Sequence, residues 1–405
     1  MTSTAALRVS APGPVVRQAR TAVGALFLTN GALVANLLPR YPQIKADLGI
    51  SNVGYGLAIA AFPAGAMVAG LAAGALIRRF GSARVAVAGT IATSVLVLIA
   101  GTAPVVAVFV AALFVAGAMD AITDVAQNAH GLEVQRRYGR SIINSFHATW
   151  SVGAVVGGSM AAGAIALGLP RGVHLAISAV LFSTVALVAL RFCLPHAATT
   201  PSGDGSHASP PLHASSGVSA HTIALLAALV LIALAGAVVE DAGMSWAAIY
   251  LSGSLDASAT LAAAGYVTLV GAQFVGRLVG DRLVDRFGER AVARTGGLIT
   301  ASGMSIALAV PSVPTTILGF AAAGFGVATL VPAAMHQADQ LPGLKPGAGL
   351  TIVAWLMRLG FLLAPPLVGW IADNVSLRAG LLVVPAAGLT VMVLASVLPP
   401  RRDSS

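Results

Sequence analysis

The sequence predicts an all-α polytopic membrane protein in which twelve transmembrane helices form two pseudo-symmetric six-helix bundles. Composition is the first of three observations that predict this fold. Of the 405 residues, 57% are hydrophobic and 9% are charged, whereas an ordinary soluble domain carries about 25% charged residues. The one cysteine, Cys193, excludes an internal disulfide and a cysteine-rich metal site. We expect neither a metal nor another cofactor.

The lengths of the apolar segments are the second observation. A membrane-spanning helix needs about 20 apolar residues, and twelve segments meet this requirement. They cover residues 21–39, 53–77, 85–102, 105–130, 142–168, 173–194, 222–250, 258–283, 292–310, 313–336, 347–372 and 377–398. The polar and basic residues 1–20 are expected to form a tail that enters the first segment, without a cleaved signal peptide.

One long connection divides the twelve segments into two groups of six. Residues 195–221 are rich in Ser, Pro, Gly and His, a composition typical of a flexible linker. The expected domains are an N-terminal bundle at 21–194, the linker at 195–221 and a C-terminal bundle at 222–398. Residues 399–405 form a second expected tail.

The distribution of basic residues predicts the orientation in the membrane. Eighteen of the 23 arginines and lysines fall in the N-terminal tail, the even-numbered loops and the C-terminal tail. Cytoplasmic loops carry such an excess of basic residues, so we expect both termini in the cytoplasm. The asymmetry also explains most of the net charge of +9, which therefore does not indicate a nucleic-acid partner.

An internal repeat is the third observation. Ile77–Gly89 (IRRFGSARVAVAG) aligns without gaps with Val284–Gly296 (VDRFGERAVARTG), and each contains Arg-Phe-Gly between the second and third span of its half. The same register pairs Gly153 in the fifth span with Gly360 in the eleventh. Parallel six-span repeats are a transporter architecture, with the substrate site between the halves near the middle of the membrane.

The fourth span carries an unusual concentration of polar residues. Asp120, Asp124 and Gln127 share one face of a helix because they are spaced i, i+4 and i+7. A carboxylate near the centre of a bilayer costs about 2.5–3.5 kcal/mol. Two on one face therefore indicate an aqueous or protein-lined cavity. The alternative is a buried polar network that only fixes helix packing.

The loops between the second and third spans of each half resemble the signature Gly-x-x-x-Asp-Arg/Lys-x-Gly-x-Arg/Lys of the major facilitator superfamily. The positions that match the signature, or stand in for it, are Gly74, Arg79 and Gly81 in the first half and Asp281, Asp285, Arg286, Gly288 and Arg290 in the second. Asp281 replaces the first glycine, and Arg78 stands where the first half should have its Asp. The resemblance implies a cytoplasmic gate at these loops, in which Asp285 carries more of the gate than position 78.

The same resemblance implies that spans 1, 4, 7 and 10 line a central cavity and that spans 3, 6, 9 and 12 face lipid. The charges agree with this arrangement, because those well inside the spans occur in spans 4, 7 and 11. The candidate cavity residues are Asn30, Asn36, Gln127, Asn128, Asp241, Trp246, Gln273, His336, Trp355 and Arg358. Arg358 could bind an anionic group of the substrate or pair with an acid of span 4, and both readings stay open.

Within the superfamily, Asp124-Val-Ala-Gln-Asn128 resembles the span 4 motif of the fucose–proton symporter branch. That branch also places a carboxylate in span 1, at a position where this sequence has Ala35. Glu240 in span 7 lies near the repeat counterpart of that position and is a candidate to replace it. The candidates for proton coupling are therefore Asp124, Asp120 and Glu240.

These observations predict a secondary active transporter that moves a small polar solute, sugar-like or a related organic compound, by alternating access with the proton as coupling ion. Rare lysine beside abundant arginine, alanine and glycine suggests a bacterial source and hence the plasma membrane. A proton-driven drug or metabolite exporter is the alternative, because Gly153 and Gly157 match part of the antiporter signature. We expect no enzyme activity and no catalytic residues, since His130 and His147 have no convincing partners. The expected partners are the substrate and the lipid bilayer, with a monomeric state.

Overall fold

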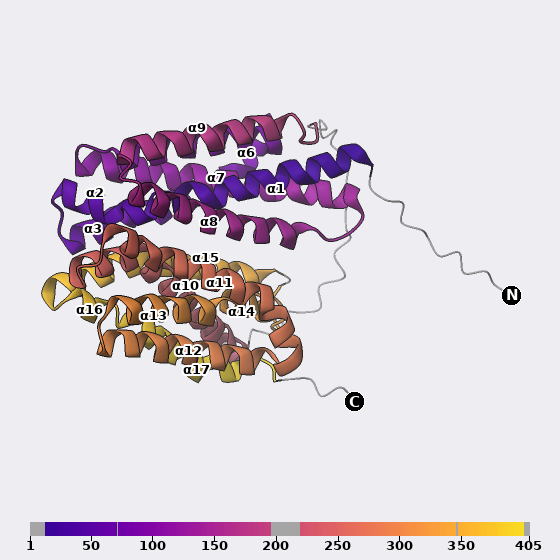
Figure 1. Ribbon diagram of the computed structural model, residues 1–405. Coiled ribbons are helices and arrows are strands. Elements are labelled where there is room, and N and C mark those ends of the chain that lie inside the picture. Colours follow the sequence, from indigo (N-terminus) through magenta and orange to yellow (C-terminus); the bar gives the residue numbers. More distant parts are fainter. Residues whose placement is uncertain (1–12, 71, 196–218, 346, 401–405) are drawn as a thin grey trace.

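The computed structural model describes residues 13–70, 72–195, 219–345 and 347–400. Within these ranges the regular structure is helical, and the helices form two stacked bundles (Figure 1). The predicted all-α polytopic fold with two six-span halves is thus confirmed. The predicted linker at 195–221 lies almost entirely outside the described residues, as do most of the two predicted tails.

The N-terminal half contains the first six predicted spans. Its helices are α1 (Pro14–Ala35), the 3₁₀ helix η1 (Leu38–Arg40), α2 (Tyr41–Leu48), α3 (Asn52–Ile59), α4 (Ala61–Ala69), α5 (Ala73–Phe80), α6 (Ser82–Gly101), α7 (Val106–Tyr138), α8 (Ile143–Ala166) and α9 (Arg171–Leu190). The first span is longer than the hydropathy pattern predicts, because it continues through η1 into α2. Pro39 and Pro42 stand in the first turns of these two pieces, where proline's missing N–H costs no helical hydrogen bond.

The C-terminal half contains the remaining six spans. Its helices are α10 (Ala220–Ser254), α11 (Ala259–Phe287), α12 (Glu289–Ala309), α13 (Val313–Val327), α14 (Leu330–Asp339), α15 (Ala348–Asn374), α16 (Leu377–Gly380), α17 (Val383–Leu394) and the 3₁₀ helix η2 (Ala395–Val397). We call the end of the molecule that carries Gly13 and Pro400 the termini end. The opposite end, where α2 and α16 lie, is the far end (Figure 1).

Eleven helical segments are long and apolar enough to cross a membrane. The predicted span at 292–310 corresponds to α12, which is not among them although it has 21 residues. Its first two turns carry Glu289, Arg290 and Arg294, and these charges lower its mean hydropathy. Because they stand at the termini end, the apolar remainder of α12 still forms the ninth span.

The repeat is visible in the backbone at two glycines. Gly81 has φ 86° and ψ 146°, and Gly288 has φ 82° and ψ 154°. Each ends one helix and begins the next, and this region of backbone conformation is essentially restricted to glycine. The two Arg-Phe-Gly motifs therefore build the same corner in both halves.

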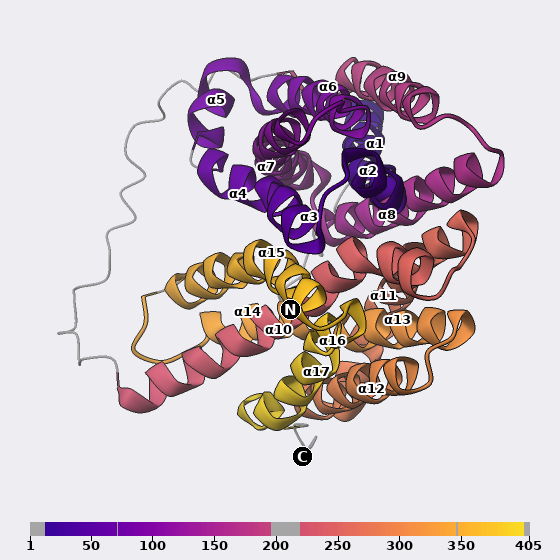
Figure 2. The same ribbon diagram turned by 90° about the vertical axis from the view of Figure 1, so that its left-hand side faces the viewer.

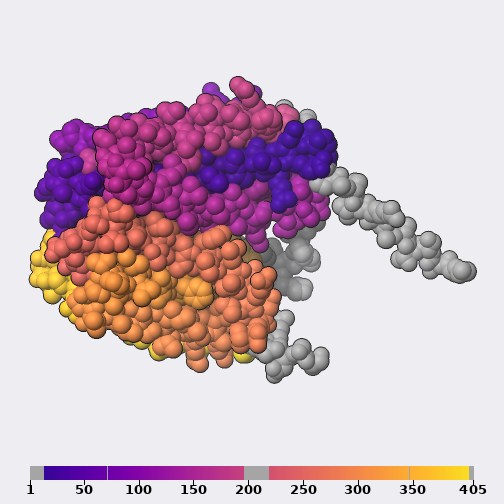
Figure 3. Space-filling view, in the orientation of Figure 1, coloured from indigo at the N-terminus to yellow at the C-terminus, as the bar shows by residue number. Residues whose placement is uncertain are grey.

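The two halves meet along α3–α15 and α8–α11 (Figure 2). A Cβ atom on Gly56 would collide with the carbonyl oxygen of Pro365, and one on Gly369 would collide with that of Asn52. Small residues let helix backbones approach this closely. Since Asn52 begins α3 at the far end, this end is closed, and Figure 3 shows the halves in contact there.

Large apolar side chains cover the outer surface of the predicted lipid-facing spans. Val180 in α9, Ile306 in α12 and Val393 in α17 are each at least 60% exposed. An exposed apolar surface of this extent requires an apolar surrounding, which the hydrocarbon core of a bilayer supplies. This placement agrees with the assignment of spans 6, 9 and 12 to the lipid.

Candidate functional site

The polar residues of the N-terminal half form one hydrogen-bond network across three helices. Asn30 of α1 donates its Nδ2 to Oδ1 of Asp120 on α7 over 2.7 Å. Trp150 of α8 donates its Nε1 to Oδ1 of the same Asn30 over 2.8 Å. A carboxamide can serve both partners because it carries a donor and an acceptor.

The second carboxylate of α7 lies one turn further toward the termini end. Asn128 donates to Oδ1 of Asp124 over 3.0 Å and to its backbone oxygen over 2.8 Å. Gln127 lies 3.4 Å from both Asp124 and Asn30, so it joins the two acids into one network. Asp124 is exposed, whereas Gln127 is buried.

Neither Asp120 nor Asp124 forms an ion pair within the described part of the chain. His147 on α8 and Arg358 on α15 are the basic side chains nearest to Asp124 on the neighbouring helices. Arg358 and Trp355, three residues apart on α15, are both exposed. Carboxylate, amide, imidazole and guanidinium groups are therefore presented together on the termini side of the network.

The C-terminal half has a smaller polar cluster around Glu240 of α10. Gln273 of α11 donates to Oε2 of Glu240 over 2.9 Å, and Arg277 lies 4.0 Å from the same oxygen. Arg277 also donates to Oγ of Ser151 on α8 over 3.2 Å. This guanidinium thus links the Glu240 cluster to the other half.

Arg277 was not among the predicted site residues. It lies six residues before the end of the predicted span 258–283, so the sequence predicts that it belongs with the basic residues of the following loop. The structure corrects this, because α11 continues to Phe287 and places Arg277 well inside the helix. The i, i+4 spacing of Gln273 and Arg277 was the signal that could have identified it.

Asp241 and Trp246 lie deeper in the closed far end. The hydroxyl of Ser245 is 3.4 Å from Oδ1 of Asp241, and the hydroxyl of Tyr55 donates to the Ser245 carbonyl over 2.8 Å. The rings of Tyr55 and Trp246 meet edge to face with centroids 5.0 Å apart. Asp241 and Trp246 therefore lie at the closed contact between the two halves in this conformation.

Two predicted cavity residues lie apart from the network. Asn36 is buried between α1 and α9, where its Oδ1 lies 2.9 Å from Nε2 of His174. His336 is exposed near the termini end, 2.9 Å from the side-chain amide of Gln340. In this conformation the structure does not bring either residue to the Asp120–Asp124 cluster.

The predicted gate residues lie in α5, in the last turns of α11 and at the glycine corners that follow these two helices. Gly74 and Arg79 are in α5, and Asp281, Asp285 and Arg286 are in the last turns of α11. Asp281 and Asp285 are exposed. Arg290 donates its Nε to the Leu398 carbonyl over 2.8 Å, within its own half.

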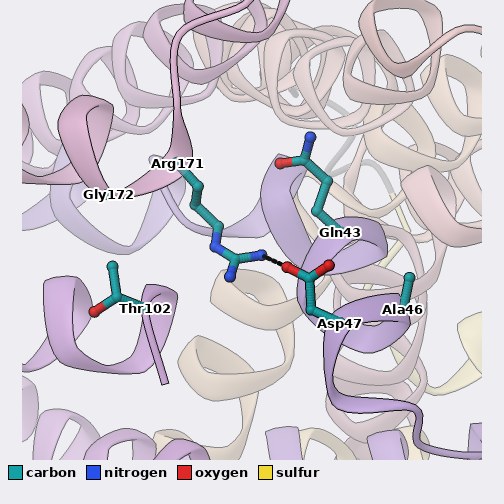
Figure 4. Close-up of a pocket in the computed structure, with 6 residues that line it drawn as sticks. All are labelled: Gln43, Ala46, Asp47, Thr102, Arg171 and Gly172. Atoms are coloured by element: carbon teal, nitrogen blue, oxygen red, sulfur yellow. Dashed lines mark hydrogen bonds and ion pairs between the residues drawn. The ribbon is translucent and has the colours of Figure 1, made fainter. Parts of the chain in front are cut away.

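The surface pocket in Figure 4 is separate from all of these residues. It has a volume of about 550 Å³ and lies at the far end of the N-terminal half. Its polar lining includes Gln43 and Thr102, and Arg171 pairs with Asp47 over 2.8 Å. Because no predicted site residue lines it, the pocket is not the candidate site.

Comparisons with known proteins agree with this architecture. The family model described as Major Facilitator Superfamily matches residues 23–282 and 229–405. "Uncharacterized transporter y4wD" of Sinorhizobium fredii is 30% identical over 376 residues, which cover 93% of this chain and 97% of that protein.

Two solved structures share the fold. The nucleoside transporter NupG superposes with a TM-score of 0.70 at 13% identity, and a D-xylose-proton symporter with 0.68 at 16% identity. Each match covers 95% of this chain and 98% of the other. At these identities the structures show a shared fold alone. The family match covers most of the sequence and assigns a carrier rather than an enzyme, so the chain belongs to the major facilitator superfamily of membrane transporters.

Proposed function

We propose that this transporter moves a small polar solute by alternating access and couples the movement to protons at Asp120 and Asp124. The main support is the way in which the two carboxylates are held, by the side-chain amides of Asn30, Gln127 and Asn128. A carboxyl group held by neutral donors can gain or lose a proton without separating from a cation. The protonation state of the carboxyl group, and hence its charge, can then change with the side of the membrane to which the cavity opens.

We further propose that the chain is related to the fucose–proton symporter branch. The Asp124–Asn128 pair that suggested this branch is hydrogen-bonded within one turn of α7. The acid that the branch carries in span 1 is replaced by Ala35, and Asn30 is the α1 residue that contacts Asp120. Coupling through Asp120 and Asp124, with Glu240 as a third candidate, is consistent with this difference.

A sugar-like solute is the substrate class that we favour. Amide and carboxylate groups such as Asn128 and Asp124 are suited to the hydroxyl groups of such a solute. The solved structures with the same fold include a nucleoside transporter and a D-xylose-proton symporter, whose named solutes both carry hydroxyl groups.

We propose that the termini end faces the cytoplasm of a bacterial plasma membrane and that the protein acts as a monomer. Most exposed arginines, including Arg136, Arg286 and Arg294, lie at that end, as cytoplasmic loops require. Under this orientation the far end, where the halves are closed against each other, faces the outside.

The proposal is tested with purified protein, first by a thermal-shift screen against sugars, nucleosides, organic acids and drugs at two pH values. The solute with the largest shift is then used in proteoliposomes with an imposed pH gradient. We expect Asp124→Asn to lose uphill accumulation but to keep counterflow, because exchange of solute for solute needs no net proton movement and the asparagine amide can still hydrogen-bond a hydroxyl group. Asp120→Asn shows whether the second acid shares this role.

Asp256→Asn is the matched control, because Asp256 is an exposed carboxylate in the α10–α11 connection. It should leave both uptake and counterflow unchanged. Full uphill accumulation by Asp124→Asn would contradict proton coupling at this residue. A shift only with drugs, together with proton-driven efflux, would favour the exporter.

A further inference from the structure

One carboxylate of the C-terminal half caps a helix of the N-terminal half at the far end. Asp373, in the last turn of α15, accepts hydrogen bonds from the backbone N–H groups of Asn52 and Val53 over 3.0 and 2.8 Å. It also accepts one from the side-chain amide of Asn52 over 2.8 Å. All three donors belong to the first turn of α3.

The first turn of a helix leaves N–H groups without partners and carries the positive end of the helix dipole. Ser51 supplies the local cap of α3, since its hydroxyl accepts from the N–H of Gly54. The N–H groups of Asn52 and Val53 are left to Asp373. The start of α3 is therefore completed by residues from both halves, and separating them at this end breaks three hydrogen bonds to a carboxylate.

The packing beside Asp373 explains how a short side chain can reach α3. Gly369, one turn earlier on α15, lies against the carbonyl of Asn52, and Gly56 of α3 lies against that of Pro365. Because neither glycine has a side chain, the backbones of α3 and α15 come into contact next to the Asp373 carboxylate. α3 cannot move away from α15 at the far end while the hydrogen bonds to Asp373 remain.

The internal repeat provides no second contact of this kind. The register that pairs Ile77 with Val284 pairs Asp373 with Ala166 at the end of α8, and Asn52 with Ala259 at the start of α11. Alanine has no acceptor for a helix N-terminus. Among the residues that the structure describes, the α3–α15 seam carries a carboxylate cap and the symmetry-related α8–α11 seam does not.

We propose that Asp373 is a latch that holds the far end closed and thereby sets the balance between the two conformations of the transporter. Opening to the far side requires the carboxylate to leave the α3 N-terminus and become hydrated. The latch depends on neither the substrate nor proton coupling, so it can be tested without a known solute.

The test measures distances between spin labels by pulsed electron paramagnetic resonance on the full chain in lipid nanodiscs. Cys193, the one native cysteine, is first replaced by alanine. One label pair is placed at the exposed far-end positions Ala46 and Ser254, and a second at Arg140 and Arg294 at the termini end. Each pair reports one end of the boundary between the halves.

We expect Asp373→Ala to raise the ratio of far-end-open to far-end-closed molecules by roughly tenfold, the effect of losing hydrogen bonds to a charged group. The far-end distance should lengthen in this fraction while the termini-end distance shortens. Asp373→Asn, which keeps the size but loses the charge, should give a smaller shift in the same direction.

Asp47→Asn is the matched control at the same end, because Asp47 pairs with Arg171 within its own half. It should leave both distance distributions unchanged. Unchanged distances in Asp373→Ala, with the protein folded, would overturn the latch. A shift of equal size in Asp47→Asn would also overturn it, since the effect would then come from surface charge alone.

Discussion

At the scale of single residues, Asn30 organises the candidate proton site. Its carboxamide donates to Asp120 and accepts from Trp150, so one side chain connects α1, α7 and α8. The acceptor oxygen has one further neighbour, Gln127, at 3.4 Å. Trp150 therefore fixes which way the amide of Asn30 faces, and through it where Asp120 is held.

Replacing Trp150 by phenylalanine tests this dependence. The ring is kept, but the 2.8 Å hydrogen bond to Asn30 is lost, and we expect the free energy of unfolding to fall by about 1 kcal/mol. The measurement is the thermal unfolding midpoint of the purified protein in detergent. Trp370→Phe is the control, because Trp370 is 59% exposed and should leave the midpoint unchanged. Equal midpoints for both variants would show that the bond adds nothing to stability.

At the scale of helices, close packing of α1 against α8 brings Asn30 and Trp150 together. A Cβ on Gly31 would strike the Trp150 carbonyl, and one on Gly157 would strike the Ala32 carbonyl. The backbones approach because these positions lack side chains. Gly157, which resembled part of an antiporter signature, has a structural reason to be glycine.

Gly157→Ala should destabilise the protein by about 1–3 kcal/mol, because the added methyl group forces α1 and α8 apart. Gly163→Ala in the same helix has open space around the added group. It should be neutral or stabilising by up to about 1 kcal/mol, since alanine is the better helix former. Chemical or thermal unfolding in detergent distinguishes the two, and equal stability would contradict the packing argument.

At the scale of the whole molecule, hydropathy and the repeat were enough to predict the fold. Each predicted span corresponds to a helix or a run of short helices, and the Arg-Phe-Gly pair identified equivalent corners. Asp120 and Asp124 could be found because polar residues stand out in an apolar segment. Arg277 was missed, because an arginine near a predicted span end resembles a loop residue. The contact of Asp373 with α3 depends on which end is closed, and hydropathy does not encode this.

The proposed orientation of the molecule is supported by where its basic side chains are exposed. At the far end, Arg40 is buried and donates to Gln43, and Arg171 is paired with Asp47. At the termini end, many arginines are exposed. The two ends therefore differ more in exposed positive charge than in their numbers of arginines and lysines. This difference favours a cytoplasmic termini end.

This orientation predicts the activity of reporter fusions made in bacterial cells. Green fluorescent protein fused after Pro400 should fluoresce, and alkaline phosphatase at the same site should be inactive, because its disulfides form only outside the cytoplasm. Fusions after Asp256, in the far-end connection between α10 and α11, should show the reverse. Enzyme activity and fluorescence are normalised to the amount of fusion protein in the membrane fraction. Active phosphatase after Pro400 would invert the orientation, and the closed far end would then face the cytoplasm.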